Sequence, residues 1–179
     1  MRGKEHHTIL RPGETVRKDH PVIRLRGMLD MLHASLVKLQ VLCHREGEES
    51  LVPKLEDAVR LIYAVMGAEV KNCAMEPVLL GGMNEEQLRQ ASHNPAKDCG
   101  AEHGIPNDRS ALVHAELNIL RAMARQCELA AVSAFIQDRD DSPPQHEDIL
   151  LALNRLSSYF YVLMCRYRAE NEKIGGTSI

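Results

Sequence analysis

The chain has 179 residues, which is enough for one domain with its own hydrophobic core. Apolar residues make up 44% of it and charged residues 26%, a composition that is typical of folded globular proteins and excludes a long disordered chain. The formal net charge is −3, so the sequence lacks the basic surplus that favours binding to nucleic acid or to an anionic membrane.

The N-terminal segment, residues 1–20, contains a turn signal at Pro12-Gly13 and no clear strand pattern, so we expect it to form a loop. Pro21 suits the first position of a helix. From Val22 to Arg45 apolar residues recur at helical spacing, which predicts a long amphipathic helix that Gly47 closes.

A second helix is predicted from about Ser50 to Lys71, because apolar residues again recur on one face. Pro77 and Gly81-Gly82 then interrupt the pattern. Asn84 is a suitable N-cap for a short helix over residues 85–91.

The second half of the chain is predicted to hold two more long helices. Residues 92–105 contain a proline and two glycines and are predicted to form an irregular loop. One helix is expected from Pro106 to about Phe135 and another from about Glu147 to Glu170, with a polar loop over 138–144 between them. With no convincing strand and no internal repeat, the sequence predicts an all-α five-helix bundle of four long helices and a short one. The expected division is an N-terminal loop (1–20), a helical domain (21–172) and a mobile tail (173–179).

Two further features of the sequence concern the cellular compartment of the protein. No stretch approaches the roughly 20 apolar residues of a membrane span, and the polar N-terminus lacks the apolar core of a secretory signal. The five cysteines are odd in number and include no C-x-x-C pair, which is typical of reduced thiols. We therefore expect a cytoplasmic protein without a membrane partner.

A polar stripe runs along the predicted helix over 106–135. Asn118, Arg121, Arg125 and Glu128 are spaced i, i+3, i+7 and i+10, which places them on one face. Two arginines one turn apart suit a polyphosphate, because a guanidinium matches phosphate oxygens bidentately. The alternative is a solvated face with an Arg125–Glu128 ion pair.

The last helix and the first helix each carry a polar residue among apolar ones. Asn154 and Ser157 can bind a ligand or a magnesium–phosphate group, whereas the alternative is a buried asparagine that fixes helix register. Asp30 lies in an apolar run and needs a partner, because an unpaired buried charge is costly. That partner is either Arg26 or His33 on the same helix, or a cation on another helix or another subunit.

Four potential metal ligands lie around the expected loop: His93, Cys99, His103 and His114. Their side chains could bind zinc or iron, but their spacing matches no standard site, so a loop that lines the active site is the other interpretation. The sequence has no GxxxxGK[ST] or GxGxxG phosphate loop, no E-x-x-H pair of a di-iron bundle and no paired C-x-x-C motifs. These absences exclude the commoner nucleotide, di-iron and zinc sites.

Three segments, in this order and at these intervals, carry a resemblance to a known family. They are VRKDHP (16–21) continuing to GMLDML (27–32), LNILR (117–121) followed by RQCE (125–128), and LNRLSSYFYV (153–162). They resemble the V-x-K-D-x-P…G-x-L-D-x-L, L-H-x-A-R…R-R-A-E and LNRLSD-aromatic motifs of the ATP:corrinoid adenosyltransferases. The S-H-x-P and H-x-x-P segments, Ser92 to Pro95 and His103 to Pro106, are similar to the ethanolamine-utilisation (EutT-type) branch, which is related to the PduO-type enzymes. The resemblance covers about residues 16–168.

The resemblance implies a helix bundle that assembles as a homotrimer, with ATP and the corrinoid meeting at subunit interfaces. It implies that the protein moves the 5′-deoxyadenosyl group of ATP to cob(I)alamin and releases triphosphate, with magnesium accompanying ATP. It further implies a corrinoid reductase and an adenosylcobalamin-dependent enzyme as partners, and a location in the cytoplasm associated with a bacterial microcompartment.

Carried over residue by residue, the resemblance implies roles for ten positions. Arg125 holds the triphosphate, with Arg121 beside it, and Glu128 and Asn154 lie near the phosphates and magnesium. Asp30 and Arg121 form an intersubunit salt bridge. Thr15 and Lys18, at the end of a nucleotide-side N-terminal segment, contact ATP. His93, His103 and Pro106 belong to the loop on the corrinoid side.

The sequence departs from the family pattern at three places, and the first two departures support an alternative. The Gly-rich N-terminal nucleotide loop is reduced to Arg11–Thr15, Gln126 stands where the family has a second arginine, and Ser158 replaces the signature aspartate, as in the ethanolamine branch. The alternative is a non-catalytic trimeric module that binds a corrinoid or a nucleotide for sensing, storage or delivery of B12.

Overall fold

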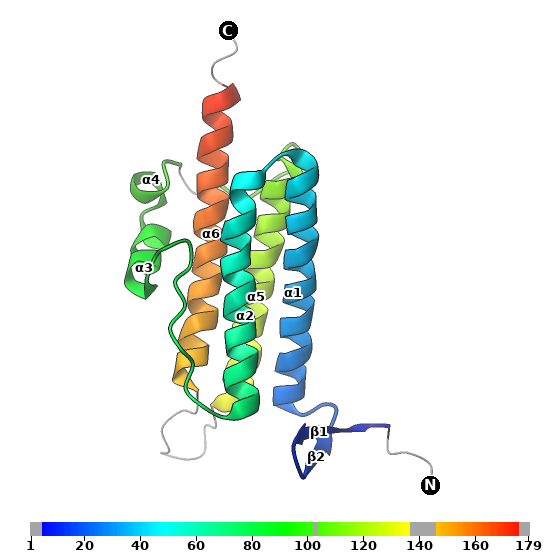
Figure 1. The fold of residues 1–179 in the computed structure, drawn as a ribbon. Helices are drawn as coiled ribbons and strands as arrows, with labels where there is room; N and C mark the ends of the chain where they lie inside the picture. Colours follow the sequence, from blue (N-terminus) through cyan, green and yellow to red (C-terminus); the bar gives the residue numbers. More distant parts are fainter. Residues whose placement is uncertain (1–4, 102–103, 137–145, 176–179) are drawn as a thin grey trace.

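The computed structural model describes residues 5–101, 104–136 and 146–175, without the side chains of 172–175. Four long helices lie side by side and form a bundle, with two short helices beside α6 and a two-stranded hairpin at the foot of α1 (Figure 1). The all-α bundle predicted from the sequence is confirmed. The long helices are α1 (Pro21–Glu46), α2 (Val52–Lys71), α5 (Leu112–Phe135) and α6 (Glu147–Gly175).

Helix α1 begins and ends as the sequence predicts. Pro21 occupies the first turn, and the His20 ring accepts a hydrogen bond from the backbone N–H of Val22 at 3.3 Å. Gly47 ends the helix with φ +77°, a left-handed conformation that glycine adopts without steric cost, and its N–H donates to the Cys43 carbonyl. Every third or fourth residue from Val22 to Cys43 is buried.

The starts of the next two helices are set by local structure. A 3₁₀ turn, η1 (Glu49–Leu51), leads into α2. The short helix α3 (Glu85–His93) begins with a reciprocal capping box, in which the Asn84 side chain accepts from the Gln87 N–H and Gln87 accepts from the Asn84 N–H. The predicted N-cap at Asn84 is therefore confirmed.

The core lies between the four long helices, where α5 packs along both α1 and α6. Tyr159 and Phe160 of α6 are fully buried in it. The Tyr159 hydroxyl donates to the Lys54 carbonyl at 2.9 Å, which satisfies its only donor and ties α6 to the start of α2. Among the helices in the described ranges, none combines the length and the apolar character that a membrane span requires.

The expectation of a loop over residues 1–20 is wrong for residues 7–17. Strands β1 (His7–Arg11) and β2 (Glu14–Arg17) pair antiparallel around a Pro12-Gly13 turn with Gly13 at φ +82°. The strands are short, a bulge lies between Ile9 and Arg11, and Leu10 is their one buried residue. Alternation of buried and exposed side chains is therefore too weak to predict strands from the sequence.

The region before α5 also differs from expectation. A short helix, α4 (Pro95–Asp98), lies within the segment predicted to be irregular, and α5 begins at Leu112 instead of Pro106. The delay has a local cause, because the Asn107 side chain accepts from the Arg109 N–H and Ser110 accepts from the Asn107 N–H, which closes a turn. The described residues thus hold six α-helices instead of five.

At the C-terminus, α6 continues through Gly175, so the first three residues of the tail predicted over 173–179 lie in this helix, and the mobility of the tail stays a prediction. Residues 176–179 and the predicted polar loop over 138–144 lie outside the described residues.

Candidate functional site

A polar cleft of about 320 Å³ lies where α5, α6 and the end of α3 meet. It brings together Arg125, Glu128 and Asn154, which the sequence predicts as site residues, and it adds His93 from the expected corrinoid-side loop. The remaining lining residues are Ser92, Leu129, Arg155, Ser157 and Ser158.

A hydrogen bond joins the two long helices at the floor of this cleft. The Asn154 Nδ2 donates to Glu128 Oε1 at 2.8 Å, and the Asn154 Oδ1 accepts from Arg155 Nη1 at 2.6 Å. The Ser157 hydroxyl donates to the Asn154 carbonyl at 2.9 Å. Asn154 is half-buried and lines the cleft. Asn154 is therefore less buried than the alternative of a register-fixing asparagine assumes, although its bond to Glu128 does join α5 and α6.

Arg125 is exposed and lines the cleft. The solvated Arg125–Glu128 ion pair, the alternative at the sequence level, does not form. Glu128 instead bonds Asn154, and no ion pair within 4.0 Å involves Arg125 in the part of the chain that the structure describes. Its guanidinium therefore keeps its full set of donors for an anionic ligand.

Arg121 lies one turn from Arg125 but does not line this cleft. It is half-buried, and its Nε donates to Asn118 Oδ1 at 3.0 Å. Burial raises the pKa of the nearby Tyr161 to about 12, against an opposing effect of the Arg121 charge. The Arg121 guanidinium is thus bonded to its own helix, and its charge acts on the Tyr161 hydroxyl of α6.

Asp30 is exposed on α1, so the fold of the single chain does not itself bury this carboxylate. Neither proposed local partner binds it. Arg26 binds Glu69, and the His33 ring contacts the Tyr63 hydroxyl at 3.2 Å. Within the described ranges Asp30 has no ion pair.

Thr15 and Lys18 do not line the cleft. Thr15 lies in β2, Lys18 follows it, and both are exposed. The hairpin lies at the foot of α1, whereas α3 lies on the opposite side of the bundle, beyond α6 (Figure 1).

The potential metal ligands that lie in the described part of the chain do not gather into one site. His93 is exposed, whereas Cys99 and His114 are buried, and burial raises the pKa of the Cys99 thiol. Over residues 5–101, 104–136 and 146–175, no group of three His, Cys, Asp or Glu side chains could hold a metal ion. His103 lies outside the described residues, and Pro106 is half-buried and does not line the cleft.

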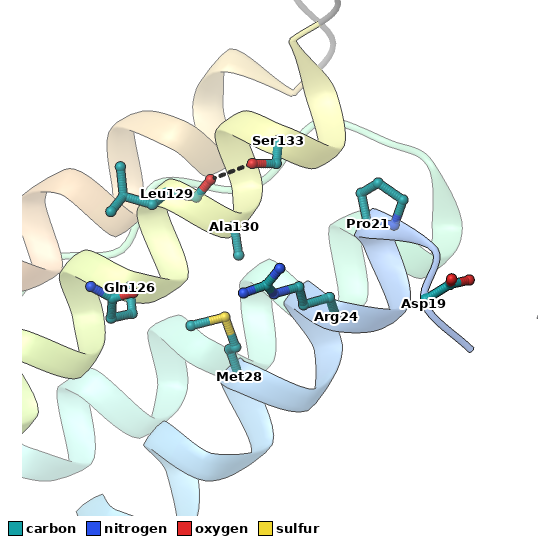
Figure 2. Close-up of a pocket in the computed structure, with 8 residues that line it drawn as sticks. All are labelled: Asp19, Pro21, Arg24, Met28, Gln126, Leu129, Ala130 and Ser133. Atoms are coloured by element: carbon teal, nitrogen blue, oxygen red, sulfur yellow. Dashed lines mark hydrogen bonds between the residues drawn. The ribbon is translucent and has the colours of Figure 1, made fainter. Parts of the chain in front are cut away.

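A second cleft, of about 200 Å³, lies between the start of α1 and the C-terminal half of α5. Figure 2 shows the Arg24 guanidinium directed into the space between the two helices, toward Gln126 and Ala130. Leu129 borders both clefts. Asp19 lines the second cleft, and a hydrogen bond from Arg17 lowers the pKa of its carboxyl. Sequence reasoning missed Arg24, because only the packing of α1 against α5 places it beside Gln126.

The chain is similar to known proteins in sequence and in fold. The family model "Cobalamin adenosyltransferase" matches residues 1–167. The corrinoid adenosyltransferases EutT of Salmonella typhimurium and of Escherichia coli strain K12 are each 32% identical over 157 residues, which are 88% of this chain. The chain spans 57% of the length of these relatives.

Two solved structures of PduO-type adenosyltransferase variants from Lactobacillus reuteri share the fold. One is complexed with cobalamin and ATP and superposes with a TM-score of 0.68 at 19% identity, covering 96% of this chain and 93% of that one. The other is complexed with ATP and has a TM-score of 0.67 at 18% identity, covering 96% and 94%.

Proposed function

The chain belongs to the cobalamin adenosyltransferase family, and we propose that it transfers the 5′-deoxyadenosyl group of ATP to cob(I)alamin. The products are adenosylcobalamin and triphosphate. The observation that carries this proposal is the cleft in which an arginine without an ion pair, Arg125, lies beside the Glu128–Asn154 pair.

The chemistry requires a site that stabilises a leaving triphosphate. The cobalt of cob(I)alamin supplies the electron pair that forms the bond to C5′, while the C5′–O5′ bond breaks and its electron pair leaves with the triphosphate. Negative charge therefore grows on the bridging oxygen, and we assign to Arg125 the hydrogen bonds that stabilise it. Arg121, one turn away on α5, adds positive charge to the same helix.

Glu128 and Asn154 fit the magnesium that accompanies ATP. A carboxylate and an amide oxygen are hard ligands of the type that magnesium takes, and their mutual hydrogen bond holds both side chains in place. When bound, magnesium neutralises charge on the phosphate oxygens. Glu128 and Asn154 then orient the phosphates relative to Arg125.

We assign His93, His103 and Pro106 to the side of the site that receives the corrinoid. His93 supports this assignment, because it lies at the end of α3 and lines the cleft with Arg125. The corrinoid would then approach from the α3 side while the triphosphate lies along α5.

We further propose a homotrimer whose sites lie between subunits. Asp30 is exposed without an ion pair in the described chain, so its carboxylate is available to Arg121 of a neighbouring subunit. Large apolar side chains support a contact on the same helices, since Met31 of α1 is 64% exposed and Ile119 of α5 is 47% exposed. Neither Thr15 nor Lys18 lines the cleft of its own chain, so we propose that both serve ATP in the next subunit.

The cellular setting follows from the family as a proposal. We expect a reductase to supply cob(I)alamin and an adenosylcobalamin-dependent enzyme to receive the product. The relationship to EutT proteins favours a role in ethanolamine utilisation, in the cytoplasm and in association with a bacterial microcompartment.

A second candidate function is a trimeric module that binds a corrinoid or a nucleotide without turning it over. The tight Pro12-Gly13 hairpin that replaces a Gly-rich loop favours it, and so does Gln126 in place of a second arginine. The two functions predict different spectra when the protein is incubated with MgATP and chemically reduced cob(I)alamin without oxygen. A transferase replaces the cob(I)alamin band with that of light-sensitive adenosylcobalamin, whereas a binding module takes up added adenosylcobalamin without making it.

A further inference from the structure

One side chain connects the first two helices to the hairpin. Arg26 of α1 donates from Nε to Glu69 Oε2 at 2.7 Å and from Nη2 to Glu69 Oε1 at 3.0 Å, a bidentate pair with α2. The same Nη2 donates to the Leu10 carbonyl of β1 at 3.0 Å. Three elements far apart in the sequence therefore meet at one guanidinium.

The burial of Glu69 explains why this guanidinium stays in place. The Glu69 side chain is only 1% exposed and that of Arg26 is 22% exposed. A buried carboxylate without a partner costs several kcal/mol, so Glu69 holds Arg26 in a fixed orientation. The second N–H of the same Nη2 then points to the Leu10 carbonyl, and Arg26 becomes a rigid anchor for β1.

The hairpin has few other attachments. Leu10 is buried against the core, but Ile9 is 69% exposed and Val16 is only partly buried. Among the described elements, the extensive contacts of β1 and β2 are with each other. A two-stranded hairpin alone is marginally stable in water, so the anchor at Leu10 strongly influences where the hairpin lies.

The anchor reaches the proposed ATP-binding residues through the strand pairing. Thr15 pairs with Ile9, the residue before Leu10. The Lys18 N–H donates to the His6 carbonyl at 2.9 Å and closes the ladder. A shift at Leu10 would therefore move Thr15 and Lys18 together.

We infer that Arg26 and Glu69 are positioning residues that hold the hairpin where Thr15 and Lys18 can contact ATP. This inference rests on the proposed function, because it takes ATP as the ligand of the hairpin. Since the hairpin would contact the nucleotide and not the corrinoid, loss of the anchor should raise the KM for ATP and leave kcat and the KM for cob(I)alamin unchanged.

Two variants and a matched control test this inference. Arg26→Lys keeps the positive charge beside Glu69 but cannot make the bidentate pair and also reach Leu10. Glu69→Gln removes the charge that fixes Arg26. The control is Glu116→Gln, because Glu116 is also nearly buried and pairs with α1 through Lys38 at 2.6 Å, but it does not touch the hairpin.

Steady-state adenosyl transfer and amide hydrogen exchange of residues 7–17 are measured for each variant. We expect Arg26→Lys and Glu69→Gln to raise the KM for ATP about tenfold and to speed exchange in the hairpin. The Glu116→Gln variant should lower the melting temperature and leave both readouts as in the wild type.

The outcomes separate this inference from the proposed function. An active wild type whose Arg26→Lys and Glu69→Gln variants keep the KM for ATP would overturn the inference and leave the function standing. A wild type that transfers no adenosyl group would contradict the function, and hydrogen exchange would still decide whether Arg26 anchors the hairpin. Equal loss in all three variants would show a general effect on stability and would also overturn the inference.

Discussion

Asn154 of α6 and Glu128 of α5 share a hydrogen bond across the candidate site, with 2.8 Å between Nδ2 and Oε1. The bond orients the Glu128 carboxylate, which forms no ion pair with Arg125. The charged side chains of Arg125 and Glu128 therefore both remain available to a ligand. A closed Arg125–Glu128 pair would instead have neutralised both charges.

This relationship allows the charge of Glu128 to be separated from its hydrogen bond. Glu128→Gln keeps an oxygen that accepts from Asn154 but removes the negative charge, so we expect a folded protein that needs more magnesium for half-maximal transfer. Glu128→Ala removes both and should also lower the free energy of unfolding by about 1 kcal/mol. Magnesium titrations and urea unfolding measure the two effects. An unchanged magnesium requirement in Glu128→Gln would contradict the assignment of Glu128, and Glu46→Gln, at the exposed end of α1, is the control.

The exposed Asp30 allows a test of assembly. Asp30→Ala should shift the equilibrium from trimer toward monomer, because Arg121 of the neighbouring subunit would lose its partner at a half-buried position. Sedimentation at several protein concentrations measures the shift. Sedimentation identical to the wild type would argue that Asp30 and Arg121 do not meet between subunits.

A shared site also predicts complementation between impaired variants. Lys18→Ala and Arg125→Ala should each transfer far more slowly than the wild type as homotrimers, whereas hybrid trimers should contain some sites with an intact Lys18 from one subunit and an intact Arg125 from the next. Co-expression of the two variants with different tags, followed by purification on both tags, provides the hybrids. Mixing Arg125→Ala with Glu128→Ala is the control, because both residues lie on one side of the same cleft. Failure of the first pair to regain transfer would place both residues in one subunit's site.

Buried thiols predict a loss of stability at alkaline pH. Burial, together with the charges of Glu48 and Glu49, raises the pKa of Cys43 from 9.0 to about 11. The thiol loses its proton more readily in the unfolded chain than in the folded one. The free energy of unfolding therefore falls as pH rises from about 9 to about 11, by up to roughly 1.4 kcal/mol per pH unit for each such thiol. Cys43→Ala should reduce this slope in urea unfolding. Cys73 is exposed, so Cys73→Ala should leave the slope as it is, and an equal slope in all three proteins would contradict the role of Cys43.

The sequence predicts the four long helices well, because each buries a stripe of apolar residues at helical spacing and has recognisable ends. Gly47 and Asn84 act as caps where their residue types predict. The start of α5 was misplaced, because Pro106 suits a first helical turn, whereas side chains of Asn107 and Ser110 bond the backbone and close a turn instead. Whether these residues form a turn or a first helical turn depends on side-chain hydrogen bonds, and the pattern of apolar residues does not predict those bonds.

The candidate site was predictable along one helix but not between helices. The spacing of Arg125 and Glu128 on α5 is a local property of the sequence, and family motifs pointed to Asn154. That Glu128 bonds Asn154, 26 residues away, depends on how α5 packs on α6. The contact of Arg26 with Glu69, 43 residues away, likewise depends on packing and leaves no local signal.

Product formation by the wild type and by Arg125→Ala tests the central claim most directly. Each protein is incubated with MgATP and cob(I)alamin without oxygen, and adenosylcobalamin and triphosphate are quantified together with the circular dichroism of the protein. We expect equal amounts of both products from the wild type, and from Arg125→Ala an unchanged helical spectrum with a rate about 10²- to 10³-fold lower, as for the loss of one charge-stabilising donor. Absence of adenosylcobalamin from the wild-type reaction, or a variant as fast as the wild type, would contradict the account.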